Sequence, residues 1–130
     1  MIRPFLATEE EAAASGVEWK QGLGETKEYK FRIQISPMDC TGCSNCVDVC
    51  PAKDKALVMR PLEEQMPQQK NWDYITKNIG YKQVVDKTKS VKNLQFAQPL
   101  FEFSGACAGC GETPYIKAIS QLFGDKMMVA

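Results

Sequence analysis

Four cysteines stand close together in the chain, and the last of them is followed by a proline: Cys40, Cys43, Cys46, Cys50 and Pro51. Thiolates at this density are typical ligands of iron or zinc, because a soft sulfur anion binds these metals well. Gaps of two residues let a tight loop wrap three thiolates around one [4Fe-4S] cubane. The fourth cysteine, one helical turn further on, points away from that cubane. The chemistry predicted is low-potential electron transfer through iron-sulfur clusters.

The spacing Cys-x2-Cys-x2-Cys-x3-Cys-Pro matches the ligand run of bacterial ferredoxins at every fixed position. Gly42 gives the loop its backbone freedom. In two-cluster ferredoxins the fourth cysteine of such a run binds the other cluster. Because the chain holds a single run, Cys40, Cys43 and Cys46 need a fourth thiolate from elsewhere. Cys50 would then belong to a second cluster. A zinc site is the alternative, although zinc sites usually pair two separated Cys-x2-Cys units.

A second pair of cysteines, Cys107 and Cys110, has the spacing Cys-x2-Cys. Half of a cluster site, half of a zinc site, a redox dithiol and two buried cysteines all use this spacing, and the pair alone leaves them open. Thr113 as an N-cap and Pro114 at the first helical position predict a helix over 114–123. The pair therefore lies at a helix N-terminus, where the dipole favours thiolate and amides can bind cluster sulfurs.

Composition excludes several classes of function. Sixteen basic residues offset sixteen acidic ones, so the basic surface of a nucleic-acid binder is not predicted. No stretch approaches the roughly 18 apolar residues of a membrane helix, and the first residues do not resemble a signal peptide. We therefore expect a cytoplasmic protein whose six cysteines are thiols and not disulfides. The absence of histidine excludes Rieske centres, His-ligated haem and His-containing zinc sites.

The segment before the first cysteine run predicts a short helix and a strand. Residues 1–30 are acidic just after Thr8 and are punctuated by glycines, which is typical of a short helix followed by loops. Apolar and polar residues then alternate, with Phe31, Ile33 and Ile35 on one face. This alternation predicts a half-buried strand that leads into the cysteine run.

A long polar connection follows over 61–98. Because roughly 40 residues with little apolar periodicity are unusual inside a compact domain, we interpret it as a linker between two modules. It has helical potential over 72–79, which Asn71 could cap. Beyond it, 99–103 predicts a strand that enters the second cysteine turn and the helix over 114–123. Strand, turn and helix together are typical of the opening of an α/β domain.

The two cysteine motifs together resemble the pyruvate:ferredoxin (flavodoxin) oxidoreductase family, thiamine-diphosphate enzymes of pyruvate oxidation. The likeness rests on the ferredoxin-type run and on Ser-Gly-Ala-Cys-Ala-Gly-Cys-Gly-Glu-Thr-Pro-Tyr at 104–115, and it extends to 2–4, 31–37 and 51–57. It implies an α+β chain with a partial bacterial-ferredoxin-like cluster module over 1–60 and the linker over 61–98. It also implies that 99–130 is the opening strand, turn and helix of an α/β thiamine-diphosphate domain.

The resemblance implies an assignment of the six cysteines to three [4Fe-4S] clusters. Cys40, Cys43 and Cys46 would bind a middle cluster. Cys50 would bind an outer cluster, and Cys107 with Cys110 would bind an inner one. Glu112 would face the thiamine-diphosphate pocket, although the dipole favours a glutamate at any helix N-terminus. The whole enzyme would also use Mg2+ and coenzyme A.

The resemblance further implies that the chain is an internal fragment, inactive alone, whose partners are the rest of the parent oxidoreductase. The first ferredoxin-type run, the pyruvate-binding domains, the other inner-cluster ligands and the Mg-diphosphate segment would belong to that parent. The implied function is to carry electrons from the oxidative decarboxylation of pyruvate to ferredoxin or flavodoxin. The alternative is a stand-alone ferredoxin-like carrier, or a subunit that completes its clusters with a partner chain. A third possibility is a zinc-binding interaction module.

Overall fold

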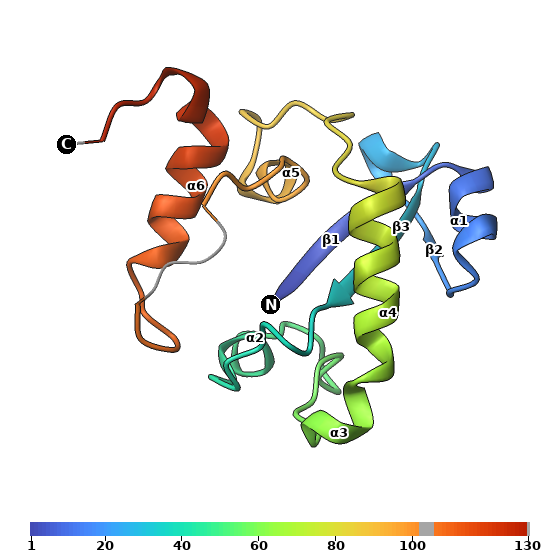
Figure 1. The fold of residues 1–130 in the computed structure, drawn as a ribbon. Coiled ribbons are helices and arrows are strands. Elements are labelled where there is room, and N and C mark those ends of the chain that lie inside the picture. Colours follow the sequence, from blue (N-terminus) through green and yellow to red (C-terminus); the bar gives the residue numbers. More distant parts are fainter. Residues whose placement is uncertain (102–105, 130) are drawn as a thin grey trace.

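The chain is organised around a three-stranded antiparallel sheet. The computed structural model describes residues 1–101 and 106–129. The strands are β1 (Ile2–Ala7), β2 (Lys20–Gln21) and β3 (Lys30–Ile35), in the order β1-β3-β2. The helices are α1 (Glu9–Ser15), α2 (Asn45–Asp48), α3 (Leu62–Gln65), α4 (Pro67–Tyr74), α5 (Val91–Leu94) and α6 (Thr113–Phe123), with the short helical turns η1 (Gly24–Thr26), η2 (Ile75–Ile79) and η3 (Gly124–Lys126). No helix in the described part of the chain has the length and apolarity that a membrane crossing needs. Figure 1 shows α4 lying along the sheet.

The first thirty residues contain the predicted short helix and two strands that were not predicted, β1 and β2. Helix α1 begins with a capping box, in which the amide of Glu11 donates to Thr8 Oγ1 at 3.2 Å and the amide of Thr8 donates to Glu11 Oε2 at 2.8 Å. Strand β1 contains Pro4, which has no amide to donate and is tolerated because β1 is an edge strand. Phe5 and Leu6 of this strand are fully buried on opposite faces of the sheet.

Strand β3 confirms the alternating pattern, but its two faces are used differently from what the pattern predicts. Gln34, only 1% exposed, faces α4, where its amide nitrogen lies 3.2 Å from Gln68 Oε1. Ile33, on the apolar face, is 51% exposed. Ile33 and Ile35 instead border the cavity beside the first cysteine run. One face of the sheet thus buries a hydrogen-bonded glutamine, and the apolar face is divided between a core cluster that contacts Phe31 and the candidate site beside Ile33 and Ile35.

The segment 61–98 differs most from its expected role as a linker. It forms α3, α4, η2 and α5, and it supplies core side chains on both faces of the sheet. One core cluster consists of Phe5, Ala7, Ala12, Trp72, Ile75 and Ile79, and the other of Leu6, Val85 and Phe96. Helix α4 begins at Pro67, so Asn71 lies inside the helix and does not cap it.

Helix α6 confirms the predicted helix over 114–123, with a different start. The helix begins at Thr113, and Glu112 occupies the N-cap position without a side-chain capping hydrogen bond. Thr113 is therefore not the N-cap. Its hydroxyl donates instead to the carbonyl of Cys110 at 3.1 Å, which joins the start of α6 to the second cysteine turn.

Helix α6 docks on α5, which separates it from the sheet in Figure 1. The buried amide nitrogen of Gln121 donates to the carbonyls of Leu94 at 3.2 Å and Ala97 at 2.7 Å. The strand predicted over 99–103 is not formed at residues 99–101, and its other residues lie outside the described part of the chain. On its C-terminal side, helix α6 thus joins the second cysteine turn to α5.

Candidate iron-sulfur site

The first cysteine run forms a loop that leaves β3 and enters the single turn of α2. The amide of Cys40 donates to the carbonyl of Pro37 at 3.1 Å, which closes a turn before the loop. Gly42 and Ser44 adopt left-handed backbone conformations, with φ of 68° and 59°. Gly42 takes this conformation without the steric cost that a side chain would add. Cys46 then lies on α2.

Helix α4 contacts the residues that lead into this loop. The side-chain oxygen of Gln69 lies 3.1 Å from the hydroxyl of Ser36 and accepts the amide of Met38 at 3.3 Å. The same Ser36 hydroxyl lies 2.6 Å from Asp39 Oδ2. Ser36 is fully buried, so the two contacts of its hydroxyl are partly shielded from water, whereas the Met38 contact is exposed. The supposed linker therefore positions the turn that precedes Cys40.

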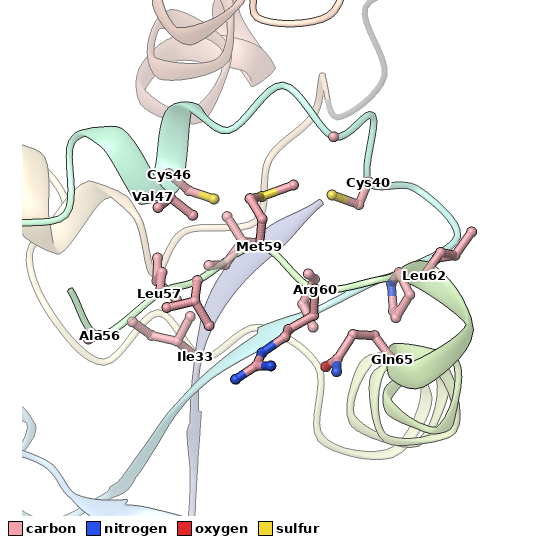
Figure 2. Close-up of a pocket in the computed structure, with 15 residues that line it drawn as sticks. Ile33, Cys40, Cys46, Val47, Ala56, Leu57, Met59, Arg60, Leu62 and Gln65 are labelled. Atoms are coloured by element: carbon pink, nitrogen blue, oxygen red, sulfur yellow. The ribbon is translucent and has the colours of Figure 1, made fainter.

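A cavity of about 490 Å3 lies between this loop and the apolar face of β3. Figure 2 shows the sulfurs of Cys40 and Cys46 directed into it from opposite sides. Ile33 and Ile35 line it from the sheet, and Met59 lines it from the segment that follows the cysteine run. Two thiols that face an apolar space suit a cluster bound through sulfur, because the apolar wall limits the access of water to the metal.

Cys50 is held apart from this cavity. It is absent from the lining of the cavity, and its sulfur accepts hydrogen bonds from the backbone amides of Ala52, Leu57 and Ala56. These bonds, that of Ala52 above all, lower the pKa of the Cys50 thiol and so favour its thiolate. Amide donors to sulfur are also what stabilises a ligand to an iron-sulfur cluster. The arrangement agrees with a Cys50 that serves a different cluster from Cys40 and Cys46.

The remaining cysteine of the run, Cys43, is exposed and does not line the cavity. In residues 1–101 and 106–129, no three Cys, Asp or Glu side chains gather closely enough to hold a single metal ion. A cubane differs from a single ion, because each of its ligands binds a different iron atom and the sulfurs stand further apart. The donor set of the first cysteine run, with its spacing, therefore stays the argument for a cluster at this site.

The structure brings the second cysteine pair against the first run. The amide of Cys110 donates to the carbonyl of Cys107 at 3.1 Å, and Gly109 between them has a φ of 74°. A Cβ added at Gly109 would stand 3.3 Å from Asn45 Nδ2 and 3.5 Å from Cys43 Cβ. The two motifs, far apart in sequence, are therefore in contact. Sequence reasoning missed both Asn45 and Gly109, because a contact at this separation leaves no local pattern.

Glu112 is exposed at the N-cap position of α6, and it does not line the cavity at the first cysteine run. Its carbonyl accepts the amide of Tyr115 at 3.1 Å, as expected in the first turn of a helix. This position agrees with a glutamate favoured by the helix dipole. Its role at a thiamine-diphosphate pocket stays a prediction.

Comparisons with known proteins bear on the cysteine chemistry. A family model described as "4Fe-4S dicluster domain" matches residues 9–53. The chain is 51% identical over 133 residues to the pyruvate:ferredoxin oxidoreductase of Moorella thermoacetica, and 50% identical over 131 residues to the pyruvate-flavodoxin oxidoreductase of Enterobacter agglomerans. Each alignment covers 99% of this chain. Over its own length the chain belongs to this oxidoreductase family.

The chain spans only a small part of these pyruvate oxidoreductases, 11% of each of the two relatives above. It is also 45% identical to the pyruvate dehydrogenase [NADP(+)] of Cryptosporidium parvum, again over 99% of the chain and over 7% of that relative. The resemblance inferred from the cysteine motifs is thus confirmed, as is the iron-sulfur character of the segment. The assignment of each cysteine to a cluster stays a prediction.

The contact at Gly109 gives a first test in a pyruvate oxidoreductase that contains this chain. Gly109→Ala should displace the second cysteine turn from Asn45, because the added methyl would stand 3.3 Å from the Asn45 amide nitrogen. The left-handed conformation would add about 1–2 kcal/mol of strain. We expect a weaker magnetic interaction between the two neighbouring reduced clusters, measured by EPR.

Two glycines provide matched controls for Gly109→Ala. A Cβ at Gly111, in the same turn, meets nothing within 4 Å, so Gly111→Ala should leave the magnetic interaction unchanged. Gly80 has a φ of 67° in open space, so Gly80→Ala reproduces the strain without the contact. An unchanged interaction in Gly109→Ala, or an equal change in Gly80→Ala, would contradict the proposed contact between the motifs.

Proposed function

We propose that the chain is the iron-sulfur electron-transfer segment of a pyruvate:ferredoxin (flavodoxin) oxidoreductase. The observation that carries the proposal is the cavity between β3 and the ferredoxin-type run, into which two of its thiols point while Cys50 is held elsewhere by backbone amides. The proposed ligand sets are Cys40, Cys43 and Cys46 for a middle cluster, Cys50 for an outer one, and Cys107 with Cys110 for an inner one.

The cluster would supply the capacity to store and release single electrons at low potential. The residues of the chain hold it and shape its surroundings. Ile33 and Ile35 present an apolar wall to the cavity, and Gln69 fixes the turn before Cys40. The amides around Cys50 stabilise its thiolate. These are the tasks that a protein performs for a redox cofactor, since the electron chemistry belongs to the cofactor itself.

The proposal extends to the organisation of the whole enzyme. Residues 1–60 would form part of a ferredoxin-like domain, and 99–130 would begin the thiamine-diphosphate domain, with Glu112 near its cofactor. Thiamine diphosphate, Mg2+ and coenzyme A would serve the decarboxylation of pyruvate in the parent enzyme. Ferredoxin or flavodoxin would accept the electrons, as the names of the relatives indicate for those proteins.

Reconstitution of the 130-residue chain with iron and sulfide tests this function. Because the chain has one ferredoxin-type run, we expect at most one [4Fe-4S] cluster per chain, measured by iron and acid-labile sulfide content and by EPR after dithionite reduction. Cys107 and Cys110 should remain titratable with a thiol reagent, since two thiolates do not complete a cluster.

Two outcomes would contradict the proposed function. Tight binding of zinc without labile sulfide would favour a zinc-binding interaction module. Two or more stable clusters per chain would favour a self-sufficient ferredoxin-like carrier. A Cys40→Ser variant is the matched control, because it removes one thiol of the cavity and leaves the second cysteine pair untouched. It should lose the cluster and retain the thiol titre of Cys107 and Cys110.

A further inference from the structure

The turn after Cys50 carries a lysine in an unusual backbone conformation. Lys55 has a φ of 46°, in the left-handed region that side chains other than that of glycine rarely adopt. Its amide donates to the carbonyl of Ala52 at 3.1 Å, which closes the turn. Strained residues of this kind persist where the surrounding structure fixes them, and they concentrate at functional sites. The contacts of the Lys55 side chain are therefore of functional interest.

The ammonium group of Lys55 is fixed against the backbone of the cysteine run. Its Nζ donates to three carbonyl oxygens, those of Val47 at 3.2 Å, Asp48 at 2.9 Å and Cys50 at 3.3 Å. Lysine has three donor hydrogens, so this set can use all of them. Val47 and Asp48 belong to α2, the helical turn that also carries Cys46. One side chain thus ties the end of α2 to the Cys50 turn and holds a positive charge between them.

This charge lies beside the residue whose thiol would bind the cluster. The Lys55 ammonium is held 3.3 Å from the carbonyl oxygen of Cys50 itself. An iron-sulfur cluster gains one negative charge when it is reduced, and a cation nearby stabilises that charge. Net charge and hydrogen bonds to the sulfurs are among the factors that set cluster potentials. A cation fixed at this turn would therefore raise the reduction potential of a cluster that Cys50 binds.

We propose that Lys55 sets the reduction potential of the cluster bound by Cys50, through an ammonium group held in place by the carbonyls of Val47, Asp48 and Cys50. The proposal rests on the proposed function, in which Cys50 is a cluster ligand. In that function the cluster held by Cys50 would carry single electrons between a neighbouring iron-sulfur cluster and a one-electron carrier protein. Lys55 forms and breaks no covalent bond in this exchange. It is a positioning residue whose charge makes the cluster easier to reduce.

Lys55→Gln in the full-length oxidoreductase tests the proposal, because glutamine retains hydrogen-bond donors for the carbonyls and removes the charge. The potential of each cluster is measured by redox titration followed by EPR. At a fixed applied potential, we expect the ratio of reduced to oxidised Cys50-bound cluster to fall about tenfold, a shift of about 59 mV for one electron. The shift should shrink at high salt, because Lys55 is exposed to solvent.

Two lysine variants provide the controls. Lys53 is an exposed lysine of the same turn, so Lys53→Gln removes the same charge from the same segment. It should shift the potential much less than Lys55→Gln does. Lys55→Arg keeps a charge and several donors, and it should retain most of the wild-type potential. Equal shifts for Lys53→Gln and Lys55→Gln would show that the potential depends on net charge alone, and would overturn the proposal.

The remaining outcomes are also decisive. An unchanged potential in Lys55→Gln with full iron and sulfide content would overturn the proposal. Loss of the cluster in Lys55→Gln would make Lys55 an assembly residue and would overturn it as well. Cys50→Ser tests the underlying function separately, since it should remove or strongly perturb one cluster signal. If all cluster signals survive in Cys50→Ser, the ligand assignment fails whatever Lys55 does.

Discussion

Cys107→Ser in the full-length oxidoreductase is expected to abolish the inner cluster and to lower pyruvate-dependent reduction of ferredoxin or flavodoxin by orders of magnitude. A serine hydroxyl is a harder and far less acidic ligand than a thiol, so it binds the iron of a cluster poorly. The Cys107 carbonyl also closes the turn by accepting the Cys110 amide at 3.1 Å, and this backbone bond is unaffected by the substitution. The change therefore removes a ligand without removing the turn.

The measurement combines cluster content with turnover. Iron, sulfide and EPR should show one cluster fewer than in the wild type, with the signals of the middle and outer clusters preserved. Ala108→Ser is the matched control, because it adds a hydroxyl to the same exposed turn and keeps both thiols. It should retain full cluster content and near-normal turnover. A Cys107→Ser enzyme with all its clusters and normal turnover would favour a redox-dithiol or structural role for the pair.

The parts of the site that could be predicted from the sequence are those with local causes. The ferredoxin-type run is a local pattern, because a loop around a cubane needs its ligands at fixed short gaps. Helix α6 is local as well, since its proline start and apolar stripe lie within one segment. The alternation in β3 predicted a strand for the same reason. Each of these predictions depended on neighbours within a few residues.

The parts that could not be predicted depend on partners far away in the sequence. Gln34 can be buried because Gln68, on α4, provides a hydrogen-bond partner for its side chain. No pattern in the sequence near Gln34 indicates this partner. The proximity of Gly109 to Asn45 likewise joins segments on opposite sides of 61–98. Alternation specifies that two faces exist but does not say which one a helix will cover. The alternation therefore could not predict which face of β3 is buried, because that depends on the packing of α4.

Segment 61–98 contains a helix that packs on the sheet, although the sequence pattern predicted a linker. Its apolar residues Trp72, Ile75 and Ile79 are spaced three and four apart, which places them on one narrow helical stripe. The residues between them are polar, so the average composition is that of a loop. A helix needs only one buried stripe to be held in place by tertiary packing. The stripe packs on Phe5 and Ala7 of β1, an edge strand that was itself not predicted.

Trp72→Ala is expected to destabilise the chain by about 3–5 kcal/mol, the usual cost of truncating a large buried aromatic residue. Trp72 is 7% exposed and packs edge to face on Phe5, with ring centroids 5.7 Å apart. The free energy of unfolding can be measured by urea titration of the reconstituted chain, followed by circular dichroism. Tyr74→Ala, on the same helix and 37% exposed, is the matched control and should change it by less than about 1 kcal/mol.

Trp72→Ala also tests whether the core supports the cluster site. Gln69 lies on α4 one turn before Trp72 and holds the turn at Ser36 and Met38, which leads into Cys40. When Trp72 no longer anchors α4, this turn loses its support, and a cluster bound at the cavity should be lost faster on exposure to air or chelator. Tyr74→Ala should keep the wild-type rate of cluster loss. If Trp72→Ala changed neither the free energy of unfolding nor the rate of cluster loss, 61–98 would behave in solution as a linker, and the support of the cysteine loop by α4 would be refuted.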